Sequence, residues 1–379
     1  MDLSFSEEQE LFRKAVRDFA AREVAPIARE YDEREEYPTH IFKKLADLGY
    51  LGLRFPPQYG GGDADAVTSV ILAEEMGYAS AGIFLGIYVH VFLALTSIHH
   101  FGSEEHKQAY LAPGIRAEKI GAWGFAEPDA GSDPGAIRTT GRRQGDGYVL
   151  NGTKMFITNG NLCDFVVVTA STEPGAAIRG LSLFIVDKGT PGFAVARTLR
   201  KLGVRASDTA ELSFQDCFIP RSALLGEENL GFANAMRTLT EGRIVAAAFA
   251  LGTARAAFDQ SLAYAKERVA FGQPIGQFQG IQWLLADMAL DLEAARLLTL
   301  QAAWLLDRGL PHVKEASMAK LFATEACARI TGQAVLLHGG YGFMMDSDVQ
   351  RFYRDCKVME IGEGTSHIQR NVIARQLGL

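Results

Sequence analysis

The sequence has little positive charge, few cysteines and no metal-binding spacing, and each absence excludes a class of function. Its 379 residues contain 38 Lys and Arg against 45 Asp and Glu, a formal net charge of −7. This balance leaves no basic surface of the kind that nucleic-acid binding requires. No Cys-x-x-Cys pair is present, so we expect no metal site and four buried or idle thiols. These thiols are Cys163, Cys217, Cys327 and Cys356.

Signals for export or membrane insertion are also missing. The opening stretch, MDLSFSEEQELFRK, is acidic and polar, whereas a secretory signal has a basic region followed by an apolar run. No later window of 18 residues is both apolar and free of charge. We therefore expect a cytoplasmic protein with no membrane partner.

Hydrophobic patterning divides the chain into three parts. Ser6 and Gln9 form a capping box, after which apolar residues recur at helical spacing up to about residue 120. From Trp123, turn residues and short β-branched runs predict an antiparallel β domain, and long amphipathic stripes after it predict a helical bundle, including one at Phe258, Leu262, Ala265 and Val269. The predicted fold is mainly α with a central β domain: an N-terminal α-helical domain 1–121, a middle antiparallel β domain 122–226 and a C-terminal α-helical domain 227–379. Because no helices separate the β runs, a parallel doubly wound sheet is not indicated.

Three glycine-containing segments are candidates for ligand contact. AEPDAGSDPG, residues 126–135, offers backbone N–H groups and the Ser132 hydroxyl to a phosphate, although a structural turn would look the same. NGTKMFITNG, residues 151–160, places Phe156 and Thr158 in a strand, where core packing is the simpler interpretation. LLHGGYGF, residues 336–343, interrupts a helix with three glycines, which indicates a turn or a close ligand because glycine costs a helix about 1 kcal/mol.

A fourth segment, IGEGTSHIQR, residues 361–370, seats Glu363 between two glycines. The glycines allow a tight backbone, and Thr365 or Ser366 can cap the helix that follows. A desolvated carboxylate has a raised pKa and can act as a general base on a carbon acid. A solvated acid near a helix N-terminus is the alternative interpretation for an isolated glutamate.

Taken together and in order, six motifs resemble the acyl-CoA dehydrogenase family over nearly the whole chain. They are AEPDAGSD, NGTKMFITNG, KLGVRASDTAELSFQDCFIP, ERVAFGQPIGQFQGIQ, HGGYGF and YRDCKVMEIGEGTSHIQRNVIARQ. The resemblance implies non-covalent FAD, a homotetramer built as a dimer of dimers, and oxidation of an acyl-CoA thioester to the trans-2-enoyl-CoA. It implies that Glu363 removes the α-proton while the β-hydride passes to N5 of FAD, and that electron-transferring flavoprotein accepts the electrons.

The resemblance also implies which residues contact the ligands. In one subunit, the residues expected along the FAD are Trp123, Phe125, Ala126, Gly131, Ser132, Phe156, Ile157, Thr158, Thr365 and His367. Those expected to reach the FAD of the neighbouring subunit are Arg268, Phe271, Phe278, Gln279, Gly339 and Gly340. Contacts to the CoA moiety or the thioester are expected from Ser132, Glu241, Arg243 and Gly364.

Several positions depart from common members of the family. Relatives often have tryptophan at Phe156, threonine at Ala126, glutamine at Leu336 and tyrosine at Gly362. Some branched-chain and long-chain relatives place their base at the position of Gly242. With glycine there, Glu363 is the better candidate base, and Glu241 is the alternative.

Two other functions stay open from the sequence. One is an acyl-CoA oxidase-type flavoenzyme that passes electrons to oxygen, and the other is a non-catalytic scaffold that keeps a flavin or CoA pocket. Leu85, Val89 and Leu93 fall on one helical face in the region that lines the acyl pocket of relatives. Their apolar character favours a short or branched acyl chain over a carboxylate-bearing one, unless they are ordinary core residues.

Overall fold

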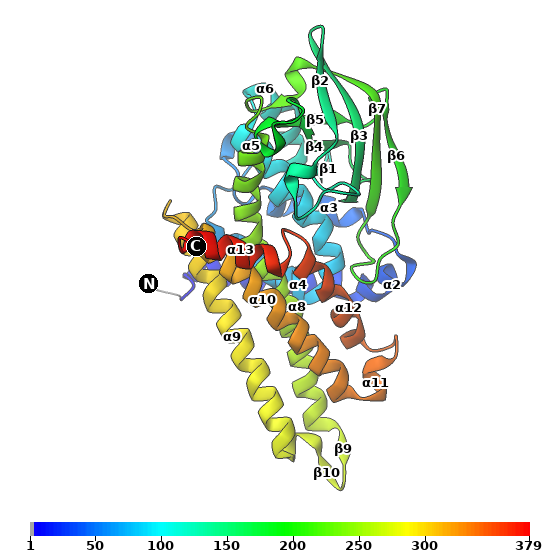
Figure 1. The fold of residues 1–379 in the computed structure, drawn as a ribbon. Coiled ribbons are helices and arrows are strands. Elements are labelled where there is room, and N and C mark those ends of the chain that lie inside the picture. The colour runs from blue at the N-terminus through cyan, green and yellow to red at the C-terminus, as the bar shows by residue number, and fades with distance from the viewer. Residues whose placement is uncertain (1–3) are drawn as a thin grey trace.

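The computed structural model describes residues 4–379 and shows a β domain stacked on one end of a long helical body (Figure 1). The capping box predicted at Ser6 is present, and Ser103 forms a second capping box with His106. The helices before the β domain are α1 (Glu7–Phe19), α2 (Ala25–Arg34), α3 (His40–Asp47), α4 (Ala66–Tyr88), α5 (Thr96–Phe101), α6 (Glu104–His106) and α7 (Ala112–Ile115). Short π-helical segments at Ala20–Val24, Val89–Leu95 and Lys107–Leu111 connect several of them.

Helix α4 runs through the centre of the helical body. It is kinked at Ser80, whose hydroxyl accepts a bond from the Ile83 N–H at 3.3 Å and restarts the helix. By length and composition the continuous stretch Ala66–Phe101 could cross a membrane, so the expectation that no segment has this character is wrong here. Within the fold, 94% of its most apolar window is buried. A helix that is apolar all round serves as the core of a large domain in this way.

The middle domain is one eight-stranded sheet. Its main path runs β6-β7-β3-β2-β4-β5-β8, and β1 pairs with β4 beside it. The predicted middle β domain is confirmed, and most of its strand pairs are antiparallel, but β1–β4 and β2–β4 are parallel, which the prediction of an antiparallel domain did not include. These strands share a direction because the β2–β3 hairpin and the turns at 159–164 carry the chain back between them. The strands are β1 (Gly121–Gly124), β2 (Thr140–Gln144), β3 (Gly147–Thr158), β4 (Phe165–Ser171), β5 (Leu181–Asp187), β6 (Phe193–Thr198), β7 (Thr209–Pro220) and β8 (Leu224–Leu225).

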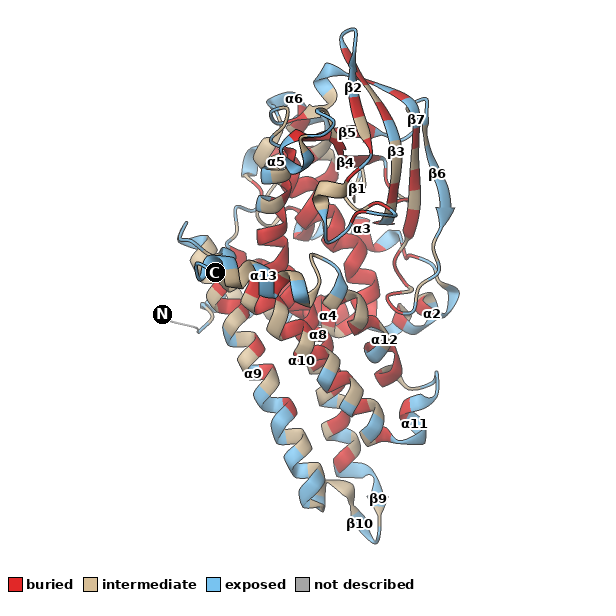
Figure 2. Ribbon diagram, viewed as in Figure 1, coloured by how far each residue is buried: buried red, intermediate tan, exposed pale blue. Residues whose placement is uncertain are grey.

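Long helices return after the sheet and form the bundle. The predicted stripe extends too far at Val269, which lies beyond the end of α8 in a short hairpin with its side chain 57% exposed. The elements are α8 (Gly231–Glu267), β9 (Val269–Ala270), β10 (Gln273–Pro274), α9 (Gln279–Asp307), α10 (Val313–His338), α11 (Gly340–Phe343), α12 (Asp348–Ile361) and α13 (Ser366–Gln376). Burial is densest where α4, α8 and α10 meet, whereas the end formed by the β9–β10 hairpin, α9 and α11 is largely exposed (Figure 2).

Two glycines bring α4 and α8 into backbone contact. A β-carbon at Gly77 of α4 would collide with the Phe249 carbonyl oxygen, and one at Gly252 of α8 would collide with the Glu74 carbonyl oxygen. The hydroxyl of Thr253 also donates to the Gly77 carbonyl at 3.1 Å. Close packing of this kind leaves no room for extra methyl groups.

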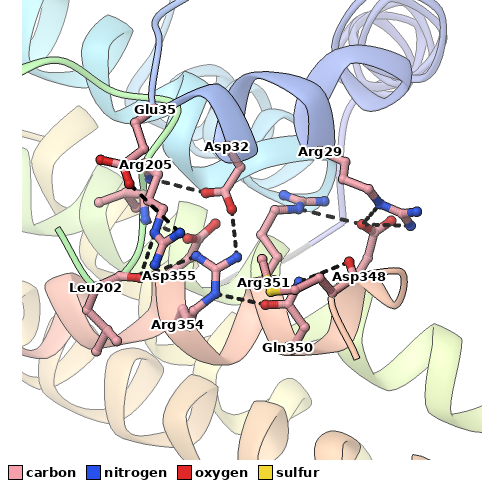
Figure 3. A network of polar contacts seen from close by, with 12 residues as sticks. Arg29, Asp32, Glu35, Leu202, Arg205, Asp348, Gln350, Arg351, Arg354 and Asp355 are labelled. Atoms are coloured by element: carbon pink, nitrogen blue, oxygen red, sulfur yellow. Dashed lines mark hydrogen bonds and ion pairs between the residues drawn. The ribbon is translucent and has the colours of Figure 1, made fainter. Parts of the chain in front are cut away.

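A polar network ties α12 to the N-terminal helices and to the loop between β6 and β7 (Figure 3). Asp32 of α2 accepts from the Arg354 guanidinium at 2.6 Å and from the Arg205 N–H at 3.2 Å. Asp355 accepts from the Val204 N–H at 2.5 Å, and its burial raises its pKa to about 6. Because α12 leads directly to the segment around Glu363, this network fixes the approach of the chain to that residue.

Candidate active site

The segment around Glu363 joins α12 to α13 with a strained backbone. Glu363 has φ of 60° and Gly364 has φ of 90°, whereas Gly362 has an ordinary φ of −63°. The glycine prediction therefore holds at one flank only, and the glutamate itself occupies the left-handed region. That conformation costs a non-glycine residue of order 1–3 kcal/mol and persists only where surrounding contacts impose it. Thr365 caps α13 as predicted, accepting from the Ile368 N–H.

Three side chains from three helices impose this conformation by binding the carbonyl groups of the turn. The Arg243 guanidinium of α8 donates to the Glu363 carbonyl at 3.2 Å. The Gln369 amide of α13 donates to the carbonyls of Glu363 and Gly364, both at 2.9 Å. The Lys320 ammonium of α10 donates to the Gly364 carbonyl at 2.9 Å. Sequence reasoning missed Lys320 and Gln369.

The backbone N–H of Glu363 takes no part in these hydrogen bonds. Within residues 4–379, no acceptor is paired with it. An N–H donor on the same residue as a carboxylate can bind the oxygen of a carbonyl group while the carboxylate contacts the neighbouring carbon. Such a fixed donor stabilises the negative charge that develops on that oxygen.

The electrostatic setting gives Glu363 the pKa of a base that works near neutral pH. Burial raises the pKa of its carboxyl to about 7, against the opposing effects of Arg243, the Tyr88 hydroxyl and Lys320. Burial also lowers the pKa of Lys320 to about 8, with Glu363 acting in the opposite direction. A general base is most effective when its pKa lies near the working pH.

The space beside the carboxylate is shaped by Gly242. A β-carbon at this position would lie 2.8 Å from Tyr88 Oη, 3.2 Å from Leu93 Cδ2 and 3.3 Å from Glu363 Oε2. The absence of a side chain on Gly242 thus leaves room for these three groups to converge. Of the face predicted to line an acyl pocket, Leu93 reaches this point, and Tyr88 joins it although the sequence reasoning did not name it.

Glu241, the alternative base, lies in different surroundings. Its carboxylate accepts from Arg54 at 3.1 Å and from His100 at 2.9 Å, in a small pocket lined also by Phe92. Burial raises the pKa of this carboxyl, but His100 and Arg54 outweigh the effect and hold the pKa at about 2. A carboxylate held ionised by its contacts with Arg54 and the His100 ring is a weak base, so the geometry favours Glu363.

A buried ion pair joins the first two glycine-containing motifs. Lys154 of β3 is fully buried and lies 2.7 Å from Glu127, and it also donates to the Phe125 carbonyl at 3.1 Å. The Glu127 carboxylate accepts further bonds from the N–H groups of Arg138 and Thr139, at 2.7 and 3.0 Å. The pair therefore fixes the loop at 125–139 against the sheet.

The predicted flavin-side residues lie around this loop and the end of β3. Phe156 has φ of 63° and its ring is 68% exposed, so the core interpretation of this residue is wrong. Trp123 stacks on Phe125 with ring centroids 5.3 Å apart, and its Nε1 is buried with no partner in the described structure. Ile157 is buried and Thr158 is half-buried. Ala126 is half-buried, and Gly131 and Ser132 are exposed on the loop.

The second predicted set lies at the far end of the bundle, away from the β domain of the same chain (Figure 1). Arg268 packs over the Tyr341 ring at 5.9 Å, and Phe271 is 96% exposed with φ of 51°. One chain therefore does not bring the two predicted FAD-contacting sets together. The set at the far end is Arg268, Phe271, Phe278, Gln279, Gly339 and Gly340. His367, which belongs to the first set, is exposed on α13 near Glu363.

Comparisons with known proteins agree on one family along the whole chain. The acyl-CoA dehydrogenase N-terminal, middle and C-terminal domain models match residues 6–118, 122–217 and 229–378. A short-chain specific acyl-CoA dehydrogenase of Clostridium acetobutylicum is 44% identical over 377 residues, covering 100% of both chains. An acryloyl-CoA reductase (NADH) of Anaerotignum propionicum is also 44% identical, over 100% of this chain and 96% of its own.

Solved structures show the same fold. Butyryl-CoA dehydrogenase of Megasphaera elsdenii superposes with a TM-score of 0.97 at 38% identity, over 100% of both chains. A chain from work on the electron-transferring flavoprotein of Acidaminococcus fermentans gives a TM-score of 0.97 at 40% identity, over 100% of this chain and 99% of its own. PigA with FAD and proline gives 0.97 at 31% identity, over 100% of both chains. The chain therefore belongs to the acyl-CoA dehydrogenase family of oxidoreductases.

Proposed function

We propose that this chain dehydrogenates a short or branched acyl-CoA thioester to the trans-2-enoyl-CoA, with Glu363 as the base. One observation carries the proposal: the carboxyl group of Glu363 has a pKa of about 7 and stands on a residue whose own backbone N–H is unpaired. The substrate would place its thioester oxygen on this N–H and its α-carbon against the carboxylate.

The Glu363 carboxylate and its backbone N–H together address the low acidity of the thioester α-proton. A thioester α-proton is too weakly acidic for a carboxylate in water, because the resulting negative charge is poorly stabilised. A fixed N–H donor that binds the thioester oxygen stabilises that charge as it forms. Arg243, Lys320 and Gln369 hold the turn by its carbonyl groups, which leaves the N–H free for the substrate.

The residues present fit FAD as the cofactor. An exposed ring at Phe156 and an unpaired buried Nε1 on Trp123 border the loop that Lys154 holds in place. When bound, FAD supplies the acceptor for the β-hydride. Trp123, Ser132, Phe156 and Thr158 would hold it in one subunit, and PigA, a structural relative, contains FAD.

A homotetramer, built as a dimer of dimers, would complete the cofactor site. The far end of the bundle exposes large apolar side chains that a second copy would bury: Phe271, Trp283, Leu290, Leu336, Tyr341 and Phe343. Because Arg268 stands among them, the neighbouring subunit would bring a cation to the cofactor phosphates. Mass measurement in solution tests this assembly.

Electron-transferring flavoprotein is the proposed electron acceptor. A structural relative comes from work on that flavoprotein in Acidaminococcus fermentans. The oxidase alternative predicts hydrogen peroxide formed at the rate of substrate loss under air. Turnover that needs the flavoprotein and forms no peroxide would exclude the oxidase.

The direct test is an anaerobic titration of the purified protein with acyl-CoA thioesters of different chain length, following flavin absorbance. Loss of the flavin band with one class of chain would establish dehydrogenation and name the substrate. Glu363→Gln should retain FAD and ligand but lose at least about 10²-fold in turnover, the low end for a removed general base. A flavin band that no thioester reduces, or full activity in Glu363→Gln, would refute the proposal.

A further inference from the structure

Tyr88 is the buried group that directly faces the proposed base. It is the last residue of α4, its side chain is 2% exposed, and its hydroxyl lies beside Gly242. Neither Tyr88 Oη nor Glu363 Oε2 has a well-formed hydrogen bond within residues 4–379. The contact between the two groups nevertheless lowers the pKa of the carboxyl and raises that of the phenol. A β-carbon on Gly242 would lie 2.8 Å from Tyr88 Oη and 3.3 Å from Glu363 Oε2, so the two oxygens border the same point beside Gly242.

Aromatic rings fill the space behind Tyr88. Its ring stacks on Phe92 with centroids 6.1 Å apart and packs against Phe249 at 5.5 Å. Phe84 closes the group at 5.6 Å from Phe249 and 6.5 Å from Phe92. All four side chains are at most 5% exposed. Rings packed this closely resist the insertion of further atoms, so a long hydrocarbon chain could pass them only if they moved.

We propose that Tyr88 is a specificity-determining and positioning residue with two separable roles. Its ring closes the far end of the acyl site, which restricts the substrate to short acyl groups, and its hydroxyl holds the Glu363 carboxylate against Gly242. This inference rests on the proposed function and narrows its substrate class.

The charges around the Glu363 carboxylate determine how removal of the Tyr88 hydroxyl changes the pKa of Glu363. Arg243 of α8 and Lys320 of α10 both favour the ionised form of Glu363, as does the Tyr88 hydroxyl of α4. Gln369 of α13 contributes an uncharged amide that binds the carbonyl of Glu363. Tyr88→Phe removes one of the three favourable groups and leaves both cations in place, so the pKa of Glu363 must rise.

The first experiment separates the hydroxyl from the ring with Tyr88→Phe. Loss of one favourable polar contact to a charged group corresponds to a shift of roughly one pH unit. The acid limb of kcat/KM should move upward by that amount while the chain-length preference stays the same. The infrared band of the Glu363 carboxyl can be identified by its loss in Glu363→Gln. The pH midpoint of its titration, measured without substrate, should move upward by the same amount. An unchanged infrared titration would overturn the positioning role.

A matched control uses another buried phenol. Tyr37 also has an unpaired hydroxyl, but it packs against Phe42 and Gly86, and burial, without a contribution from Glu363, raises its pKa. Tyr37→Phe should leave the pH limb in place. An equal shift in both variants would assign the effect to general loosening of α4 and would also overturn the role.

The second experiment opens the end of the site with Tyr88→Val and, as a smaller change, Tyr88→Leu. The ratio of kcat/KM for octanoyl-CoA to that for butyryl-CoA should rise at least tenfold, because each methylene admitted to an apolar pocket is worth about 10-fold or more. The same ratio should appear in calorimetric affinities measured on the double variants with Glu363→Gln, which cannot turn over. An unchanged ratio in whichever variant folds would overturn the specificity role.

The outcomes distinguish this inference from the proposed function. If no thioester reduces the wild-type flavin, the proposed dehydrogenation fails, while the infrared titration still decides the role of the Tyr88 hydroxyl. If butyryl-CoA reduces the wild type but the Tyr88 variants behave like it, the function stands and the inference fails.

Discussion

Replacing Glu363 by Gln should stabilise the protein, and by more at high pH than at low pH. Burial raises the pKa of the Glu363 carboxyl from 4.5 to about 7, so between these values the folded protein keeps a proton that the unfolded chain has released. Stability falls with rising pH wherever the folded state binds more protons. Glutamine is uncharged throughout and avoids this loss. By linkage, the free energy of unfolding of Glu363→Gln should exceed that of the wild type by about 1 kcal/mol at pH 5 and by about 3 kcal/mol at pH 8.5.

The assay is urea unfolding of the FAD-loaded wild type and variant at several pH values across this range, followed by tryptophan fluorescence. Glu293, which is exposed on α9, provides the control, because a substitution at the surface should change the free energy of unfolding by less than about 0.5 kcal/mol. A difference between Glu363→Gln and the wild type that stays constant between pH 5 and pH 8.5 would refute the reasoning, because it would mean that the carboxyl titrates alike in the folded and unfolded chain.

Three further changes test other parts of the structure. Lys154→Met leaves the buried Glu127 carboxylate without its cation, and urea unfolding should show a loss of about 3–5 kcal/mol. Gly77→Ala forces a methyl group into the Phe249 backbone and should cost about 1–3 kcal/mol, whereas Gly280→Ala in open space on α9 should gain up to about 1 kcal/mol. Arg268→Ala should lower the FAD content of the purified protein, and full FAD retention in a dissociated monomer would contradict a site shared between subunits.

The fold followed from the sequence where local patterns decide it. The capping box at Ser6, the strands β3 to β7 and the long helices after the sheet follow local patterns of the sequence, although the stripe that predicted α8 extended too far at Val269. The strands β1 and β2 were missed because they are short and rich in glycine and arginine. Their parallel pairing with β4 depends on contacts distant in sequence, which no local pattern encodes.

The site was predicted only where the signal is a motif. The flanking glycines indicated Glu363 as a site residue. Lys320 gave no comparable motif, because it is one polar residue in an alanine-rich helical segment. The signal available in the sequence was a lysine in an apolar stripe, because such a lysine needs a partner, and the structure buries Lys320 completely. Tyr88 was missed although it lies three residues after Leu85, a spacing that places the two side chains on the same helical face.

The turn around Glu363 shows how stability is given up where the chemistry needs it. The residue occupies a left-handed conformation, its carboxyl group is desolvated, and its backbone N–H is unpaired, and each of these features is unfavourable to folding. The bonds from Arg243, Lys320 and Gln369 offset them, yet all three end on carbonyl groups and none on the N–H or the carboxylate. The two groups that the proposed reaction uses are therefore the two that Arg243, Lys320 and Gln369 leave unbound. A turn selected for stability alone would have satisfied them.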